Sequence, residues 1–199
     1  MRSPLQTLSS LLLAAILVPV KHGTAIAAAP DSLVATDSTT TTVIVVRHAE
    51  RNTTLVGADP PLSATGVLRA QALRHALKDA GVAAIYVTPY LRNRQSAEPL
   101  ATALGESLTV VYEVEETVRR LRTRHRGQTV LVVGHSDTVP QIVASLTRRP
   151  FPTPGHIAYD GMWVVTVAED GGASLLALRY GSPADTPPEP PSPSKAIKP

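Results

Sequence analysis

The chain has 199 residues, of which 43% are hydrophobic and only 4% aromatic, so a single globular domain with an aliphatic core is expected. The formal net charge is +3, and no basic stripe interleaved with aromatic residues is present, which argues against a nucleic-acid partner. The absence of cysteine excludes disulfides, thiol nucleophiles and thiolate metal ligands.

The beginning of the chain has the features of an export signal. An apolar stretch runs from Leu8 to Val20 after a single basic residue, and small residues suited to cleavage end at Ala27 or Ala29. The stretch is short for a membrane span, although an uncleaved anchor is the alternative. We predict a signal peptide over residues 1–29, a polar linker over 30–41, and a secreted or periplasmic protein without a stable membrane anchor.

Strands and helices alternate along the rest of the chain. Runs rich in β-branched residues predict strands at 42–46, 84–87, 108–112, 129–133 and 162–168. The turn sequence Glu169-Asp170-Gly171-Gly172 predicts a hairpin that joins the last of these to a strand at 173–180. Periodicity, caps and glycine stops predict helices from Ser63 to the stop at Gly81 and at about 92–104, 115–125 and 138–147. The alternation implies an α/β domain over 42–181, with a mostly parallel sheet between two helix layers and a C-terminal β-hairpin. Residues 182–199 have little to bury and are predicted to form a disordered Pro-rich tail.

The first predicted helix has a clear N-terminal signal. Ser63 is its expected N-cap, and Leu68, Leu73, Ala76 and Leu77 mark its expected apolar face.

Two buried strands each end in a histidine. The strand before Arg47-His48 and the strand before Gly134-His135 consist almost wholly of Val, Ile and Leu. Polar groups at the carboxyl ends of central strands lie where open α/β sheets build their sites. Packing alone does not explain this pattern, so we expect a functional site at these two histidines. The polar loop 49–61 is expected to lie over the end of the first strand.

Four segments in order carry a family resemblance. They are Arg47-His48-Ala49-Glu50, Leu62-Ser63-x-x-Gly66-x-x-Arg69-Ala70, Thr88-Pro89-Tyr90-Leu91-Arg92-x-x-Gln95-Ser96-Ala97 and Gly134-His135-Ser136-Asp137-Thr138-Val139. Together they resemble the signature motifs of the histidine phosphatase superfamily and cover most of residues 43–147. The resemblance implies a phosphoglycerate mutase-like fold and a phosphatase of the short, exported kind.

The candidate site residues fit phosphoryl transfer. His48 is the predicted nucleophile, which requires one ring nitrogen without a proton while the other donates to a backbone carbonyl. Arg47 and Arg92 are predicted to clamp the phosphoryl oxygens, whereas Arg94 is expected to be a solvated charge. His135 is expected across the phosphate from His48, as a cation or hydrogen-bond donor. Backbone amides of the helix that begins near Thr138 are expected to add to this anion site.

The proton donor to the leaving oxygen is left open between two carboxylates. Glu113 follows the third strand, with an ordinary exposed acid as its alternative reading. Asp137 lies two residues after His135, with a helix N-cap as its alternative. His156 and Tyr159, in a Pro-rich loop, are candidates for lining the pocket. A metal site built from His48, His135 and Asp137 is disfavoured because the adjacent arginines repel a cation.

These observations predict an exported, metal-independent phosphomonoesterase that needs no cofactor and acts on a small-molecule phosphomonoester through phospho-His48. Two alternatives remain: a phosphate or sugar-phosphate binding protein without turnover, and a phosphohistidine-protein phosphatase. The physiological substrate and the oligomeric state do not follow from the sequence.

Overall fold

The computed structural model describes residues 40–55, 57–151 and 157–184. The predicted signal peptide, nearly all of the linker and most of the predicted tail lie outside these residues. Within the described part of the chain, none of the helices has both the length and the apolar character needed to cross a membrane.

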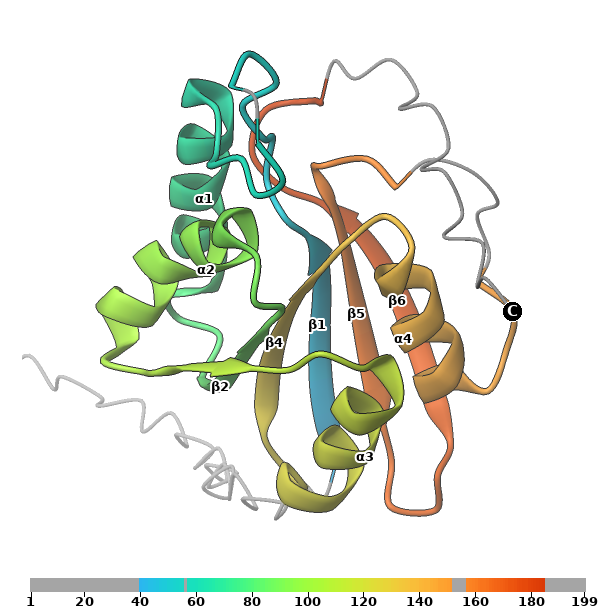
Figure 1. The fold of residues 1–199 in the computed structure, drawn as a ribbon. Helices are drawn as coiled ribbons and strands as arrows, with labels where there is room; N and C mark the ends of the chain where they lie inside the picture. Colours follow the sequence, from blue (N-terminus) through green and yellow to red (C-terminus); the bar gives the residue numbers. More distant parts are fainter. Residues whose placement is uncertain (1–39, 56, 152–156, 185–199) are drawn as a thin grey trace, which may run out of the picture. The chain divides into compact units, whose positions relative to one another are not determined.

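The strands and helices alternate as predicted (Figure 1). In chain order they are β1 (Thr41–Arg47), α1 (Ala64–Leu77), β2 (Val82–Val87), α2 (Leu91–Leu104), β3 (Leu108–Val110), α3 (Val114–Arg124), β4 (Thr129–Gly134), α4 (Thr138–Thr147), β5 (Gly161–Val167) and β6 (Ala173–Arg179). Strand β3 is shorter than the predicted 108–112, although the Val111 backbone N–H still donates to the carbonyl of Val87 at 2.9 Å.

The six strands form one sheet in the order β3-β2-β4-β1-β5-β6. Strands β3, β2, β4 and β1 are parallel to one another, β5 is antiparallel to β1, and β6 is antiparallel to β5. Arg47 at the end of β1 pairs with Gly134 at the end of β4. This register brings the next residues, His48 and His135, to the same edge of the sheet.

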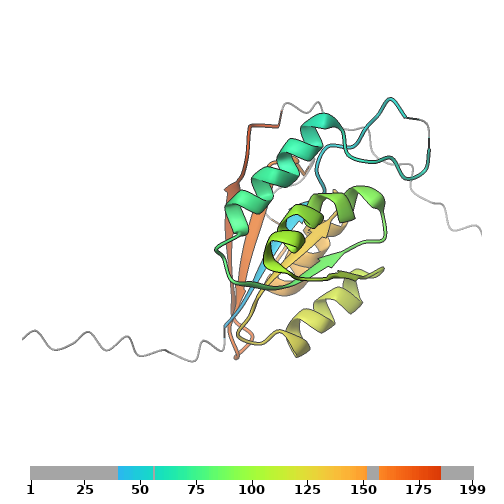
Figure 2. The ribbon, with the colours of Figure 1, turned by 90° about the vertical axis from the view of Figure 1, so that its left-hand side faces the viewer.

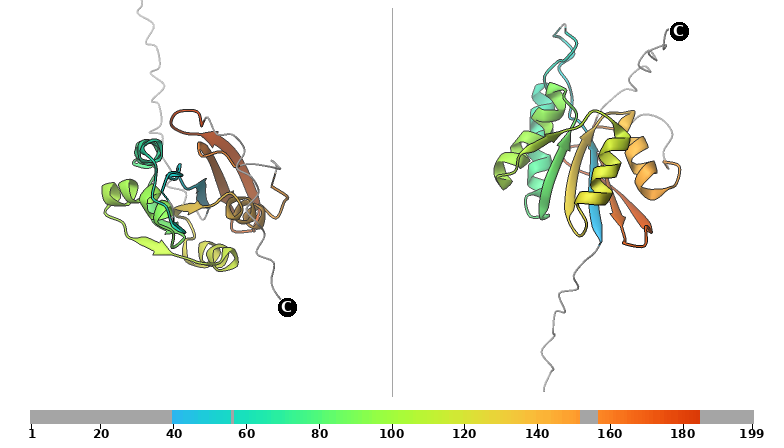
Figure 3. Two further views of the ribbon diagram at one scale, coloured as in Figure 1. Left: turned by 45° about the horizontal axis from the view of Figure 1, so that its top comes forward. Right: turned by 60° about the horizontal axis from the view of Figure 1, so that its bottom comes forward.

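Helices cover both faces of the sheet (Figure 2, Figure 3). Alternate residues of the central strands point into two separate apolar cores, as the period of a strand requires. One core is shared with α1 and α2, through residues such as Leu73 and Leu100, and the other with α3 and α4, through residues such as Leu121 and Ile142. The predicted α/β/α layering with a C-terminal hairpin is therefore confirmed.

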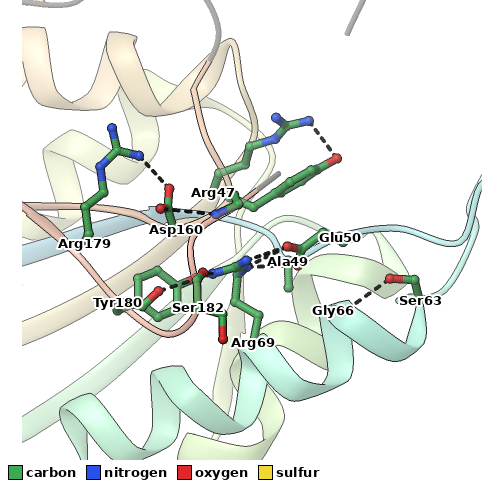
Figure 4. A network of polar contacts seen from close by, with 12 residues as sticks. Arg47, Ala49, Glu50, Ser63, Gly66, Arg69, Asp160, Arg179, Tyr180 and Ser182 are labelled. Carbon is green, nitrogen blue, oxygen red and sulfur yellow. Dashed lines mark hydrogen bonds and ion pairs between the residues drawn. The ribbon is translucent and has the colours of Figure 1, made fainter. Parts of the chain in front are cut away.

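The buried face of α1 differs from the predicted one. The Ser63 N-cap is confirmed, because its Oγ accepts from the Gly66 N–H at 3.1 Å (Figure 4). Leu68, however, is 71% exposed, and Ala76 is exposed as well. The buried residues are Gly66, Arg69, Ala70, Leu73 and Leu77.

The error has a physical cause. A prediction based on apolar residues ignores a glycine and an arginine even where both are buried. Gly66 and Arg69 nevertheless lie on the same buried face of α1 as Leu73. Gly66 is needed there because a Cβ at this position would lie 2.2 Å from the carbonyl oxygen of Glu50. Close contact between α1 and the loop after β1 therefore decides which side of the helix is buried.

Candidate active site

His48 is held at the sheet edge by its backbone and its ring. Its N–H donates to the carbonyl of Gly134 at 2.9 Å, and its side chain is buried. Nδ1 lies 2.8 Å from the carbonyl oxygen of Ala49, which can only accept, so Nδ1 carries the hydrogen. Nε2 accepts from Nε of Arg92 at 3.2 Å. The neutral Nδ1–H tautomer follows from these two partners, and Nε2 presents a lone pair, as the predicted nucleophile requires.

The electrostatics of the site favour the neutral ring of His48. Burial lowers the pKa of His48 well below its usual value, and the bond to the Ala49 carbonyl only partly opposes this effect. His135, Arg47 and Arg92 lower the pKa of His48 further. At neutral pH the imidazole is therefore uncharged and keeps its lone pair.

Arg92 lies in the first turn of α2 and reaches the site as predicted. Besides its contact with His48, its Nη1 lies 3.4 Å from Oδ1 of Asp59, and its Cζ lies 4.3 Å from the ring centroid of Tyr90. Arg94, two positions later, is exposed. The structure thus brings the motif arginine to His48 and leaves Arg94 on the surface.

Arg47 is buried at the end of β1 and contacts the segment that leads into β5. Its Nη1 donates to the Ile157 carbonyl at 2.8 Å, and its Nη2 donates to the Tyr159 hydroxyl at 3.1 Å. Its Cζ lies 3.9 Å from the Tyr159 ring centroid, and that ring lies 5.8 Å from the ring of His48. Arg47 therefore adds positive charge beside His48 while donating to neighbouring protein groups. His156, the other candidate from this loop, lies outside the described residues.

His135 stands beside His48, with the two ring centroids 5.2 Å apart. Nε2 of His135 lies 2.8 Å from Oγ1 of Thr88. Burial first and the Arg92 charge second lower the pKa of His135 to about 4, against the opposing effect of Asp137. In this structure His135 is thus suited to hydrogen bonding as a neutral ring, and the predicted cationic form requires an anion to be bound next to it.

The N-terminus of α4 does not present the free amides that were expected. The Thr138 N–H donates to Oδ1 of Asp137 at 2.9 Å, and the Val139 N–H donates to the carbonyl of His135 at 3.0 Å. The next residue, Pro140, has no N–H. The first turn of this helix therefore satisfies itself, and the prediction that it adds amides to the anion site has no support in its hydrogen bonding.

The two predicted proton donors lie at helix N-termini. Asp137 caps α4 and is exposed, with its carboxylate on the Thr138 N–H. Glu113 is the N-cap of α3 and is exposed. It follows β3, the edge strand that β2 and β4 separate from β1. Among the described residues, neither carboxylate is found in a hydrogen bond or ion pair with His48, Arg92 or His135. The part of the chain that the structure describes also contains no group of three His, Asp or Glu side chains arranged to hold a metal ion.

The carboxylate that the structure does place at the site is Asp59. Both its oxygens accept from the Leu91 N–H at 3.0 Å, and Oδ1 faces Arg92. Sequence reasoning treated Asp59 only as part of the polar loop. The feature of the sequence that could have singled out Asp59 is its position before Pro60-Pro61, because two consecutive prolines restrict the path of the loop into α1.

Two polar residues of α2 support the site without entering it. The Ala49 N–H donates to Oγ of Ser96 at 2.8 Å, and this hydroxyl donates to the Arg92 carbonyl at 2.7 Å. Nδ2 of the fully buried Asn93 donates to the carbonyls of Val133 and Gly134 at 3.0 and 3.1 Å. These bonds fasten the start of α2 to the ends of β1 and β4, which carry the two histidines.

Two residues from different motifs, the buried Arg69 and the partly buried Glu50, form an ion pair. Nε of Arg69 donates to both carboxylate oxygens of Glu50 at 2.8 and 2.9 Å (Figure 4). Nη1 of Arg69 donates to the carbonyls of Tyr180 and Ser182 at 3.2 and 3.0 Å. The pair joins the loop after β1 to α1 and to the chain that follows β6.

The fold and the site geometry define an α/β protein with a paired-histidine, arginine-lined site at the carboxyl edge of its sheet. The sequence model of the Histidine phosphatase superfamily (branch 1) matches residues 43–117. A comparison with curated proteins found no match. This match confirms the predicted resemblance to the histidine phosphatase superfamily over residues 43–117, and the solved structures confirm the predicted phosphoglycerate mutase-like fold.

Three phosphatases among these structures illustrate the likeness. The protein histidine phosphatase SixA complexed with tungstate is 23% identical, with a TM-score of 0.58 over 69% of this chain and 96% of that chain. A putative alpha-ribazole-5'-P phosphatase from Escherichia coli is 16% identical, with a TM-score of 0.60 over 70% and 96%. A mycobacterial glucosyl-3-phosphoglycerate phosphatase is 14% identical, with a TM-score of 0.57 over 71% and 100%. At these identities the likeness concerns the fold.

Proposed function

We propose that the protein is a metal-independent phosphomonoesterase that forms a phosphohistidine on Nε2 of His48. The observation that carries this proposal is the pair of contacts on the His48 ring. Nδ1–H donates to a backbone carbonyl, and Nε2 faces the side chain of Arg92. A ring that only binds phosphate does not need a deprotonated nitrogen beside a guanidinium, whereas a nucleophile does.

The chemistry has two displacements at phosphorus. In the first, the Nε2 lone pair of His48 forms a bond to phosphorus while the bond to the ester oxygen breaks, and the alcohol leaves with a proton taken from a general acid. In the second, a water oxygen bonds to phosphorus while the water gives a proton to the conjugate base of that acid, the P–N bond breaks, and its electron pair returns to Nε2. Arg92 and the buried charge of Arg47 oppose the negative charge of the phosphoryl oxygens, and His135 supplies a hydrogen bond from the other side.

Export is part of the same proposal. Its support is the sequence pattern of residues 1–29, with an apolar stretch and small residues before a polar segment. We propose cleavage near Ala27 or Ala29 and release into a periplasm or the medium. N-terminal sequencing of the mature protein tests this, and a chain that keeps residues 1–29 in the membrane fraction contradicts it.

The activity is tested on the full chain with p-nitrophenyl phosphate in the presence of a chelator. Wild type is expected to hydrolyse the ester and to form an acid-labile, alkali-stable phosphoprotein with labelled substrate. His48→Asn is expected to lose both, whereas His75→Asn, which changes an exposed histidine of α1, keeps both.

Each other outcome has a defined meaning. Loss of activity with the chelator contradicts metal independence. Thermal stabilisation by phosphate without turnover on any phosphoester supports the binding-protein alternative, which the absence of a contact from Glu113 or Asp137 to the histidines favours. Turnover confined to a phosphohistidine peptide identifies a phosphohistidine-protein phosphatase instead.

A further inference from the structure

We propose that Asp59 is the proton donor to the leaving oxygen and the base that activates water in the second displacement. This inference rests on the proposed phosphatase function. The sequence left the proton donor open between Glu113 and Asp137, and the structure favours a residue of the loop between β1 and α1 instead.

The geometry links Asp59 to the nucleophile through one guanidinium group. Nε of Arg92 contacts Nε2 of His48 at 3.2 Å, and Nη1 of the same group contacts Oδ1 of Asp59 at 3.4 Å. The guanidinium of Arg92 therefore contacts His48 through Nε and Asp59 through Nη1. A phosphoryl group that Arg92 holds beside His48 is expected to lie near Asp59 as well. The side chain of Asp59 is 45% exposed, so a ligand and water can both reach it.

Asp59 is also held in place without being enclosed. Its carboxylate accepts from the Leu91 N–H at 3.0 Å, and Pro60-Pro61 restrict the backbone that follows. By contrast, Glu50 is occupied by the buried Arg69, and the carboxylate of Asp137 is occupied by the N-terminus of α4. Of the carboxylates considered for this role, Asp59 is the one with a contact to an arginine that itself contacts His48.

Substrate binding supplies the reason for Asp59 to take up a proton. In the structure, the guanidinium of Arg92 contacts the carboxylate of Asp59, and the negative charge of Asp59 partly opposes the lowering of the pKa of His135. A phosphoryl dianion competes for the guanidinium and brings negative charge next to the carboxylate. Both effects favour the protonated carboxyl group.

The proton balance is then complete. The protonated Asp59 gives its hydrogen to the ester oxygen as the P–O bond breaks, leaving phospho-His48, a neutral alcohol and a carboxylate. Water next gives a proton to this carboxylate as its oxygen bonds to phosphorus and the P–N bond breaks. Inorganic phosphate leaves, and Asp59 has regained the proton that it donated.

The test compares two esters that differ in the need for a proton donor. Asp59→Asn keeps the size of the side chain and an oxygen for the Leu91 N–H, but it has no proton to donate. With a simple alkyl phosphate, kcat/KM is expected to fall by about 10²- to 10⁴-fold. With p-nitrophenyl phosphate, whose leaving group is stable as an anion, the loss is expected to be below about tenfold for formation of phospho-His48. Asp59→Glu, which restores a carboxyl group, is expected to recover part of the alkyl phosphate activity.

Glu113→Gln and Asp137→Asn are the matched controls, because they remove the two carboxylates predicted from the sequence. Thermal unfolding of each variant establishes that it folds. An equal loss on both esters in Asp59→Asn overturns the proposal, since it indicates only a role in positioning Arg92. A leaving-group-dependent loss in either control overturns it as well. If the wild type forms no phosphohistidine, or forms one that persists in His48→Asn, the proposed function itself fails. This result is distinct from a failure of the Asp59 proposal alone.

Discussion

Nε of Arg92 donates to Nε2 of His48 at 3.2 Å, so the cation expected to bind phosphate contacts the nitrogen expected to attack it. The contact joins the first turn of α2 to the residue after β1. Burial is the main cause of the lowered pKa of His48, and the guanidinium adds to it. Together with the Ala49 carbonyl on Nδ1, the same contact selects the tautomer with a lone pair on Nε2.

Arg92→Lys is expected to lower kcat/KM for p-nitrophenyl phosphate by about 10²- to 10³-fold, although the charge is conserved. An ammonium group lacks the planar set of donors that meets His48, Asp59 and a phosphoryl oxygen together. The matched control is Arg94→Lys, which changes an exposed residue of the same helix and is expected to leave activity unchanged. Equal effects of the two substitutions would contradict this role for Arg92.

The lowered pKa of His135 predicts a pH-dependent stability. The folded protein binds a proton on His135 only near about pH 4, whereas an unfolded histidine binds one near 6.5. Between these values the unfolded state holds more protons, so the free energy of unfolding decreases as the pH falls through this window, by at most about 1.4 kcal/mol per pH unit for this residue.

Urea unfolding of wild type and His135→Gln across the window measures this contribution. The stability advantage of wild type over the variant should shrink as the pH falls, because the variant cannot take up this proton. A His75→Gln control, at an exposed position, should follow wild type. Parallel curves for wild type and His135→Gln would show that His135 titrates normally in the folded protein.

Ser96 offers a test of the support beneath the site. Ser96→Ala leaves the buried N–H of Ala49 without its hydroxyl partner, which is expected to cost about 1–3 kcal/mol of unfolding free energy. Because Ala49 holds Nδ1 of His48, kcat should fall more than KM rises. Ser96→Thr keeps the hydroxyl and should retain most of both properties. A threonine variant as damaged as the alanine variant would attribute the effect to packing.

The revised face of α1 predicts unequal effects from two chemically identical changes. Leu73→Ala removes a side chain that is 1% exposed and is expected to cost about 2–5 kcal/mol of unfolding free energy. Leu68→Ala removes one that is 71% exposed and is expected to change stability by less than about 0.5 kcal/mol. Urea unfolding of both variants decides the matter, and a costly Leu68 substitution would restore the face predicted from the sequence.

Sequence patterns predicted the elements well because most strands are short runs rich in β-branched residues, the last strand follows a clear turn sequence, and each helix has a recognisable start or stop. They predicted His48, His135 and Arg92 as a group because short motifs follow strands whose ends must meet in a parallel sheet. They did not reveal how those groups are supported. Asn93 and Ser96 act through carbonyl and amide groups of distant segments, and such bonds have no signature in residue type alone.

The sequence by itself determined the α/β layering, the two histidine-ended strands and the family resemblance, because these depend on local periodicity and on short motifs. Only the tertiary structure decided the tautomer of His48, the buried side of α1 and the carboxylate beside Arg92. Each of these depends on contacts between segments that are far apart in the chain, such as Asp59 with α2 or Glu50 with Arg69. Side-chain chemistry restricts which contacts are possible, but the packing of the loop after β1 against α1 and α2 selects those that form.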